Sequence, residues 1–173
     1  MSSIIRADNN DVELLAGIGR QTFIESHGHC ASVADIQEYV NEKYSSHTFR
    51  EELANSNNIY HKVFYNGQVA GYSKIMVNSS TANINSPAVT KLERLYLLKQ
   101  FYGLQLALAL LDHNIKLARQ YGQQGMWLYV WKDNPRAIHF YLKNGFKIIG
   151  SHDFKISETH SNPNHQMLLW WGK

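Results

Sequence analysis

The sequence predicts an α/β fold in which helices flank a mixed β-sheet. Three observations support this class. Strand-like and helix-like segments alternate through residues 92–171, a helical repeat of apolar residues covers 104–121, and Asn66-Gly67 separates two strand-like runs. The chain has 173 residues, of which 44% are hydrophobic and 18% charged, which is typical of one globular domain. We therefore treat residues 1–173 as a single domain.

The N-terminal part is predicted to be one strand followed by helices. Residues 3–7 form a short strand, and residues 11–26 form a helix with Asp8 or Asn10 as its N-cap. A second helix begins around Ser32 and continues to about residue 44. Thr48, followed three residues later by Glu51, indicates a third, short helix that ends near residue 55.

The middle of the chain is predicted to be a β-hairpin. Residues 60–65 and 68–77 are strand-like, and Asn-Gly between them is the preferred sequence of a tight hairpin turn. A polar loop over residues 78–88 follows.

The remaining elements alternate. Residues 92–98 form a strand, 104–121 a helix that ends at Gly122, and 126–131 an apolar strand of the kind buried on both faces. Asn134-Pro135 supplies the N-cap and first residue of the next helix, which ends near Gly145. Residues 146–150 and 166–171 are the last two strands, joined by a polar, histidine-rich loop.

The composition excludes several classes of protein. Cys30 is the only cysteine, so no intramolecular disulfide forms, and no apolar run approaches the roughly 20 residues that span a membrane. We expect a cytoplasmic protein with no membrane partner. Lys and Arg are dispersed, which argues against nucleic-acid binding. The histidines and Cys30 lack paired zinc-site spacing, so we expect no metal.

Charge is distributed unevenly along the chain. Residues 1–52 carry nine acidic residues and four Lys or Arg, whereas the rest of the chain carries five acidic residues and 13 Lys or Arg. A basic C-terminal part suits a phosphate-bearing ligand, and an acidic N-terminal part suits a cation. Solvated helix faces without a ligand explain the same pattern.

The turn between residues 98 and 104 is the first candidate site. A strand that enters a helix through a glycine-containing turn directs backbone N–H groups and the positive end of the helix dipole outward, which suits a pyrophosphate. The second candidate site is the segment 134–146. It places Asn134, Ala137, Phe140-Tyr141 and Gly145-Phe146 on and directly after one helix.

Together these two segments resemble the GNAT acetyltransferase superfamily. The family carries a [Gln/Arg]-x-x-Gly-x-[Gly/Ala] pyrophosphate loop and then an Asn…Ala…Phe-Tyr…Gly-Phe segment, and the second pattern is complete here. The first aligns with 102–107, where Tyr102 replaces Gln or Arg, Gln105 replaces Gly, and Ala107 keeps the small residue. The resemblance implies a central, mixed, mostly antiparallel twisted sheet flanked by helices.

Several further segments resemble the PaiA-like branch of the superfamily. They are Gln21-Thr22-Phe23, Gly71-Tyr72-Ser73-Lys74, Leu92-Glu93-Arg94-Leu95-Tyr96-Leu97, Met126-Trp127-Leu128-Tyr129-Val130-Trp131 and Gly150-Ser151-His152-Asp153-Phe154. PaiA-like proteins acetylate polyamines such as spermidine. The resemblance therefore implies transfer of an acetyl group from acetyl-CoA to a primary amine, a polyamine or another small cationic amine, by direct attack in a ternary complex. It also implies a possible homodimer.

The resemblance assigns roles to individual residues. Tyr141 is the general acid that protonates the departing thiolate. Glu93 is a candidate on separate grounds, because an acidic residue on an otherwise leucine-rich strand is unusual. We expect it to face the amine and to act as general base, directly or through water, with water alone as the alternative. A buried aromatic for Tyr141 and an ion pair with Lys91 for Glu93 remain the alternatives. His27 lines the acceptor groove. The implied CoA-binding residues are Leu95, Tyr96, Leu97, Tyr102, Gly103, Leu104, Gln105, Leu106, Ala107, Asn134, Tyr141 and Lys143.

Rival functions remain open at this stage. An acetyltransferase for a protein lysine or N-terminus requires an open groove, and an acetyltransferase for a xenobiotic amine is a further enzymatic reading. A non-enzymatic alternative is a regulatory protein that binds CoA without turnover. Tyr102 and Gln105, which depart from the family pattern in the pyrophosphate loop, support this alternative.

Overall fold

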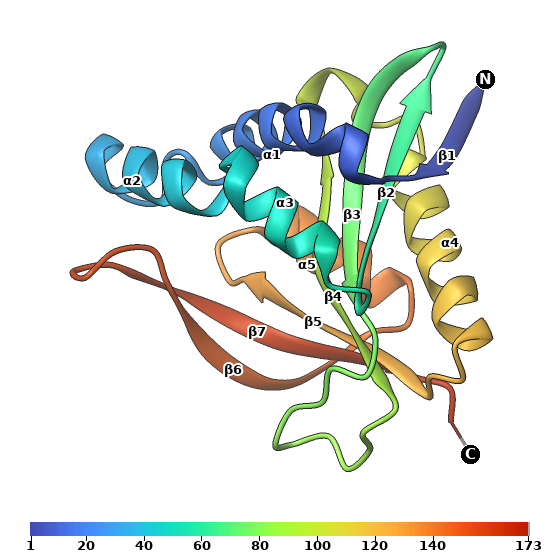
Figure 1. The fold of residues 1–173 in the computed structure, drawn as a ribbon. Helices are drawn as coiled ribbons and strands as arrows, with labels where there is room; N and C mark the ends of the chain where they lie inside the picture. The colour runs from blue at the N-terminus through green and yellow to red at the C-terminus, as the bar shows by residue number, and fades with distance from the viewer. Residues whose placement is uncertain (173) are drawn as a thin grey trace.

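A computed structural model describes residues 1–172 as one seven-stranded sheet with helices on both faces (Figure 1). The strands are β1 (Ser2–Arg6), β2 (Asn58–Tyr65), β3 (Gln68–Met76), β4 (Val89–Leu97), β5 (Gly125–Trp131), β6 (Lys147–Lys155) and β7 (Ser161–Trp170). The helices are α1 (Val12–His27), α2 (Val33–Lys43), α3 (Ser46–Ala54), α4 (Leu106–Gln120) and α5 (Pro135–Lys143), with 3-10 turns η1 (Asn9–Asp11) and η2 (Lys99–Phe101).

The sheet has the order β1-β2-β3-β4-β5-β7-β6. Every neighbouring pair is antiparallel except β4 and β5, which are parallel. The prediction of a mixed, mostly antiparallel sheet flanked by helices is confirmed. The parallel pair is short, because only residues 89–91 of β4 pair with residues 125–127 of β5, and the two strands then separate.

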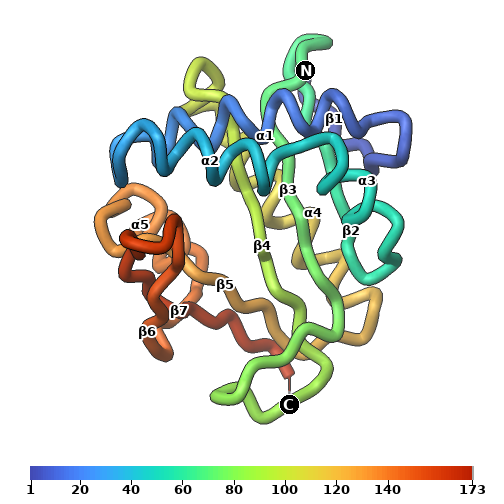
Figure 2. Tube along the Cα trace, turned by 60° about the vertical axis from the view of Figure 1, so that its left-hand side comes forward, coloured from blue at the N-terminus to red at the C-terminus, as the bar shows by residue number. Residues whose placement is uncertain are grey.

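The helices divide between the two faces of the sheet (Figure 2). Leu15 and Phe23 of α1, Val40 of α2 and Phe49 of α3 share one core cluster with Tyr72 of β3. Another cluster joins residues of α4 and α5 to strand residues such as Ile75 and Leu128. The point where β4 and β5 separate therefore opens toward α1 and α2 on one face and toward α4 and α5 on the other.

Most of the predicted signals for turns and helix ends are found. Asn66 and Gly67 have φ of 48° and 80°, as the predicted tight turn requires. Ser32 caps α2, and the Asn134 side chain caps α5 with Pro135 as first residue. Gly122, with φ of 72°, follows the end of α4.

Three predicted helix starts differ from the structure. Asp8 caps η1, whereas Asp11 is the N-cap of α1. The third helix begins at Ser46, because the side chain of Ser45 accepts the Thr48 N–H. The fourth helix begins at Leu106, because Gln105 adopts a left-handed conformation that ends the preceding loop.

The predicted loop between the last two strands is wrong in most of its length. Residues predicted as loop, among them His152, Asp153, Asn162 and Asn164, are paired in a long β6–β7 hairpin. β6 is an edge strand with much of its length exposed, so its residues are polar and resemble a loop in sequence. β4 likewise begins at Val89, before the predicted residue 92.

Candidate active site

A cleft of about 600 Å³ opens where β4 and β5 separate. Its walls come from the α1–α2 side, the α4–α5 side, the two strands and the β6–β7 hairpin. Beyond Lys91 and Trp127 the two strands form no ladder with each other. Their facing backbone groups are therefore available to an extended ligand, in the manner of an added strand.

One end of the cleft is built from the loop before α4. Gly103 and Gln105 have positive φ of 82° and 58°, and no side chain caps the helix. The first backbone N–H groups of α4, from Leu106 onward, therefore lack an intrahelical partner and face an anion-binding position with the helix dipole behind them. This geometry fits the pyrophosphate of CoA.

Gln105 occupies the position where the family pattern has glycine. Its left-handed conformation explains that preference, since a side chain there costs roughly 1–2 kcal/mol. The side chain borders the cleft without preventing the loop conformation.

Arg136 supplies a cation that the loop sequence lacks. Its guanidinium lies 3.7 Å from the centroid of the Tyr102 ring, and both residues line the cleft. Tyr102 stands where the family has Gln or Arg, so the stacked Arg136 from α5 brings positive charge to the same place. Sequence reasoning missed this residue, because the contact joins segments more than 30 positions apart.

Helix α5 brings Tyr141 into the cleft. Asn134 accepts a hydrogen bond from Ala137 N at 3.1 Å, and this cap fixes the start of the helix. Tyr141 is 9% exposed, packs against Phe140 and Phe146, and lines the cleft. Burial raises the pKa of its phenol, so the hydroxyl stays protonated at neutral pH and is available as a donor.

Glu93 lies at a β-bulge in β4. Lys74 pairs with Arg94 and Ile75 with Leu92, so Glu93 has no partner in β3. A bulge interrupts the period-two alternation of side chains, so the direction of Glu93 does not follow from counting along the strand. The bulge lies directly after the last residue of β4 that pairs with β5, so it marks the opening of the cleft.

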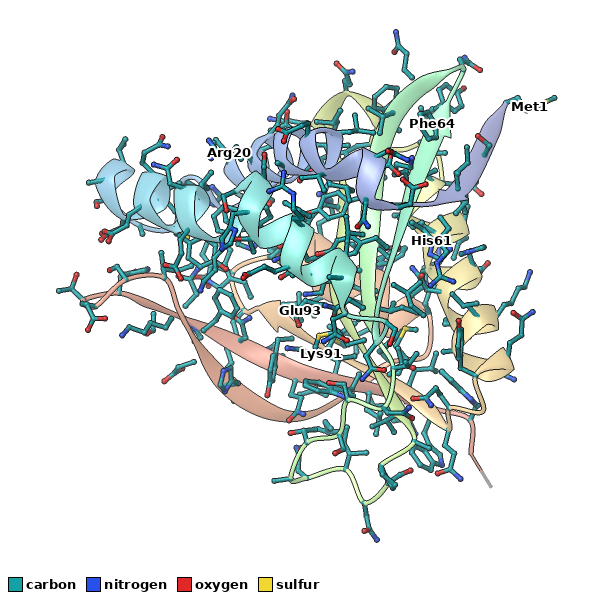
Figure 3. The ribbon with its side chains drawn as sticks, viewed as in Figure 1. Met1, Arg20, His61, Phe64, Lys91 and Glu93 are labelled. Carbon is teal, nitrogen blue, oxygen red and sulfur yellow. The ribbon has the colours of Figure 1, made fainter. Side chains whose placement is uncertain are left out.

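Glu93 forms an ion pair with Lys91 (Figure 3). Their charged atoms are 2.5 Å apart, and Lys91 also lies over the rings of Trp127 and Tyr129. Burial raises the pKa of Glu93, but Lys91, Lys74 and Arg94 outweigh it, and the pKa falls below its ordinary value. Glu93 is therefore ionised at neutral pH, and the ion pair foreseen as an alternative is present.

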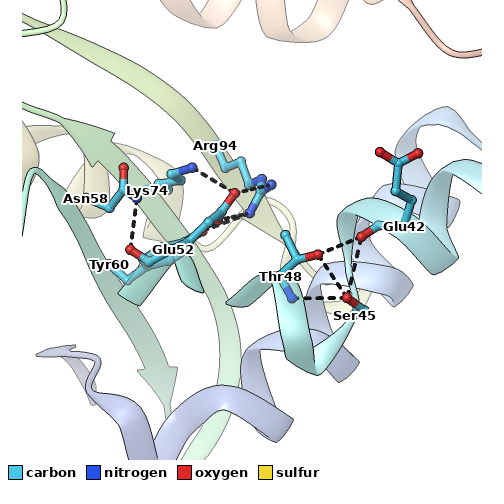
Figure 4. Close-up of polar contacts among 8 residues, drawn as sticks. All are labelled: Glu42, Ser45, Thr48, Glu52, Asn58, Tyr60, Lys74 and Arg94. Atoms are coloured by element: carbon cyan, nitrogen blue, oxygen red, sulfur yellow. Dashed lines mark hydrogen bonds and ion pairs between the residues drawn. The ribbon is translucent and has the colours of Figure 1, made fainter. Parts of the chain in front are cut away.

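A buried charged network supports this part of the cleft (Figure 4). Glu52 of α3 forms ion pairs with Arg94 and Lys74, each at 3.0 Å, and accepts a hydrogen bond from the Tyr60 hydroxyl. Arg94 also donates to Tyr60 Oη at 2.8 Å and lies over the Tyr44 ring. The network places one carboxylate between two cations and fixes β4 to α3 beside the bulge.

His27, predicted for the acceptor groove, lines the cleft from the end of α1. Its ring stacks on Phe23 with centroids 5.0 Å apart and lies 5.6 Å from the ring of Trp131. Burial, assisted by His29, lowers the pKa of His27 to about 4, so the imidazole is neutral at pH 7.

The structure brings nearly all the predicted site residues to this one cleft. Glu93, Leu95, Tyr96, Leu97, Tyr102, Gly103, Gln105, Leu106, Ala107, Asn134, Tyr141, Lys143 and His27 all line it. Leu104 does not, and its side chain is exposed in the loop. Lys91, Arg94 and Arg136 also line the cleft, and none of the three was among the predicted site residues.

Two features are absent from the described residues, 1–172. No three His, Cys, Asp or Glu side chains among them gather as a group that could hold a metal ion. None of the helices in that part of the chain combines the length and the apolar character needed to cross a membrane.

Residues 21–146 match the profile of the acetyltransferase (GNAT) family. An uncharacterized N-acetyltransferase of Mycobacterium tuberculosis is 28% identical over 152 residues, covering 88% of this chain and 93% of that protein. Spermidine N(1)-acetyltransferase of Thermoplasma acidophilum is 25% identical over 142 residues, covering 80% and 83%.

The fold matches solved structures as well. The crystal structure of PaiA N-acetyltransferase from Thermoplasma acidophilum in complex with coenzyme A has a TM-score of 0.80, with 22% identity over 99% of both chains. The fold, the loop geometry and the family match agree. The chain belongs to the acetyltransferase (GNAT) family.

Proposed function

We propose that this chain transfers the acetyl group of acetyl-CoA to a small cationic primary amine, with Tyr141 as general acid. One observation carries the proposal: a single cleft joins the anion-binding end of α4, the protonated Tyr141 hydroxyl and the ionised Glu93. The free edges of β4 and β5 connect these parts.

The amine nitrogen requires a lone pair before it attacks. An alkylammonium has a pKa of about 10, so the bound ammonium must lose a proton first. Glu93 attracts the ammonium form, and its lowered pKa makes it a weak base, so the proton leaves through water beside the carboxylate. Nitrogen then bonds to the acetyl carbon, which acetyl-CoA presents as an activated thioester.

The carbon–sulfur bond breaks as the amide forms, and the sulfur must gain a proton. The Tyr141 hydroxyl supplies it, and the attacking nitrogen releases its second proton to solvent. Solvent then reprotonates the tyrosine, so that amine and thioester give amide and thiol. A positioned acid of this kind contributes roughly 10²–10⁴-fold. Burial raises the pKa of the phenol, so the hydroxyl keeps this proton until the thiolate forms.

The proposal also concerns the chemical identity of the amine acceptor. The spermidine acetyltransferase relative is the support for a polyamine. Spermidine therefore belongs in any first panel of amines.

The test is thiol release from acetyl-CoA with a panel of primary amines. It compares the unmodified chain with Tyr141→Phe and with the control Tyr121→Phe, whose exposed ring lies directly after α4. We expect kcat to fall roughly 10²–10⁴-fold in Tyr141→Phe while the Kd for CoA, measured by calorimetry, changes less than about twofold. Tyr121→Phe should retain full activity. An unchanged kcat in Tyr141→Phe refutes the acid, and tight CoA binding without turnover favours a regulatory protein.

A further inference from the structure

The part of the cleft that faces α1, α2 and the β6–β7 hairpin is walled by aromatic side chains. We call it the aromatic wall, and its members are Phe23, His27, Tyr39, Tyr96, Trp131 and Phe154. The rings lie in contact from β5 through α1 and α2 to β6. Trp131 and His27 have centroids 5.6 Å apart, Phe23 and Tyr39 4.8 Å, and Tyr39 and Phe154 6.0 Å.

Negative charge in the cleft is limited to one side chain. Glu93 is the single Asp or Glu among the described residues that line it, and Lys91 is paired with it at 2.5 Å. His27 is neutral at pH 7. The second cation on this side, Arg94, forms an ion pair with Glu52, which it shares with Lys74.

The acidic residues of the N-terminal part lie elsewhere. Asp11 pairs with Lys62 at 2.5 Å, Glu13 accepts a hydrogen bond from Ser46, and Glu25 accepts one from the backbone N–H of Lys99. None of the three lines the cleft. The acidic bias of residues 1–52 therefore provides no row of carboxylates for an acceptor with several charges.

This distribution distinguishes between kinds of amine. An acceptor with two or three ammonium groups would carry at least one of them into the aromatic wall without a carboxylate, and burying an unpaired charge is costly. A single ammonium is served by Glu93 alone. A flat ring attached to it gains contact area and aromatic stacking along the wall.

We propose that the preferred acceptor is a monoamine carrying an aromatic ring on a short linker, of the arylalkylamine class, with its ammonium at Glu93 and its ring against the aromatic wall. The proposal rests on the acetyltransferase function above and narrows its acceptor. Phe154 suits a test by substitution, because it is half-buried and lies on the edge strand β6.

The first test compares kcat/KM for 2-phenylethylamine, tryptamine, ethylamine and spermidine by thiol release. We expect both arylethylamines to exceed ethylamine roughly 10- to 100-fold, the gain from burying one ring. Spermidine should fall below the arylethylamines. Spermidine as the best acceptor, or equal values for ethylamine and phenylethylamine, would overturn the proposal.

The second test measures the ratio of kcat/KM for phenylethylamine to that for ethylamine. Phe154→Ala should lower the ratio about tenfold. The matched control is Phe64→Ala, which removes a ring of similar exposure from β2, away from Glu93 (Figure 3). An unchanged ratio in Phe154→Ala, or an equal fall in both variants, would contradict the proposal that the aromatic wall binds the ring of the acceptor.

A binding measurement separates this proposal from the acetyltransferase function. If no amine releases thiol, the proposed function fails, and quenching of tryptophan fluorescence by phenylethylamine and by spermidine in the presence of CoA still tests the wall. Tighter binding of phenylethylamine than of spermidine, lost in Phe154→Ala, supports the aromatic wall. The reverse order refutes it.

Discussion

The histidine pair between β2 and α4 makes the stability of this protein depend on pH. His61 is 4% exposed, its ring centroid is 4.3 Å from that of His113, and its Nδ1 has no hydrogen-bond partner among the described residues. Figure 3 shows His61 on the side of the sheet that α4 covers. Burial, with smaller contributions from His113 and Arg6, lowers the pKa of His61 to about 4 from the ordinary 6.5.

The sign and size of the effect follow from this difference. Above pH 6.5 the imidazole is neutral in both the folded and the unfolded chain, and its contribution to stability is fully present. As the pH falls from 6.5 toward 4, the unfolded chain binds a proton that the folded chain does not, so stability is lost. At pH 5 the loss from His61 is about 2 kcal/mol at most.

The measurement is urea unfolding, followed by tryptophan fluorescence, at pH 7.5 and pH 5.0. His61→Phe keeps a ring of similar size and removes the titrating group. Between pH 7.5 and pH 5.0 the unfolding free energy of this variant should therefore fall by about 2 kcal/mol less than that of the unmodified chain. The control His139→Gln changes an exposed residue of α5, and its unfolding free energy should fall as much as that of the unmodified chain. An equal fall in His61→Phe and the unmodified chain would refute the assignment to His61.

Two further variants probe the charged groups around the cleft. Glu52→Gln leaves Arg94 buried without its carboxylate and should lower the unfolding free energy by about 3 kcal/mol in urea, whereas Glu51→Gln, on the exposed side of α3, should change it by less than about 0.5 kcal/mol. Equal effects would show that the network contributes nothing specific. Arg136→Gln should raise the Kd for CoA, measured by calorimetry, roughly 10- to 100-fold through loss of charge-assisted contacts, and the exposed Lys147→Gln less than about twofold. A normal Kd in Arg136→Gln would exclude it from the phosphate site.

Features with a local cause were predictable from the sequence. The Asn66-Gly67 turn, the Ser32 cap and the Asn134-Pro135 helix start depend on neighbouring residues and appear as expected. The segment that carries Tyr141 was recognised because its pattern lies within one helix and the turn after it. The same locality explains why the helix over 104–121 was found but its start was misplaced, since the left-handed Gln105 has no signature in sequence.

Features with a nonlocal cause were missed. The bulge at Glu93 depends on how β4 aligns with β3, and the register of a strand pair cannot be predicted from the sequence of either strand alone. Arg136 meets Tyr102, and Tyr39 meets Phe154, only after the sheet has formed. The β6–β7 hairpin resembled a loop because one of its strands is an exposed edge whose polar residues hide the alternation.

The three residue pairs that join β4 to β5 have a consequence for turnover. They form a narrow seam between the half of the sheet that carries β1 to β4 and the half that carries β5 to β7. A donor lying between the separated strands bridges the two halves, so each catalytic cycle completes the sheet on binding and interrupts it again on product release. We therefore expect the amide hydrogens of residues 93–97 to exchange more slowly when CoA is bound. We also expect the opening of the same seam to limit the rate at which the thiol product is released.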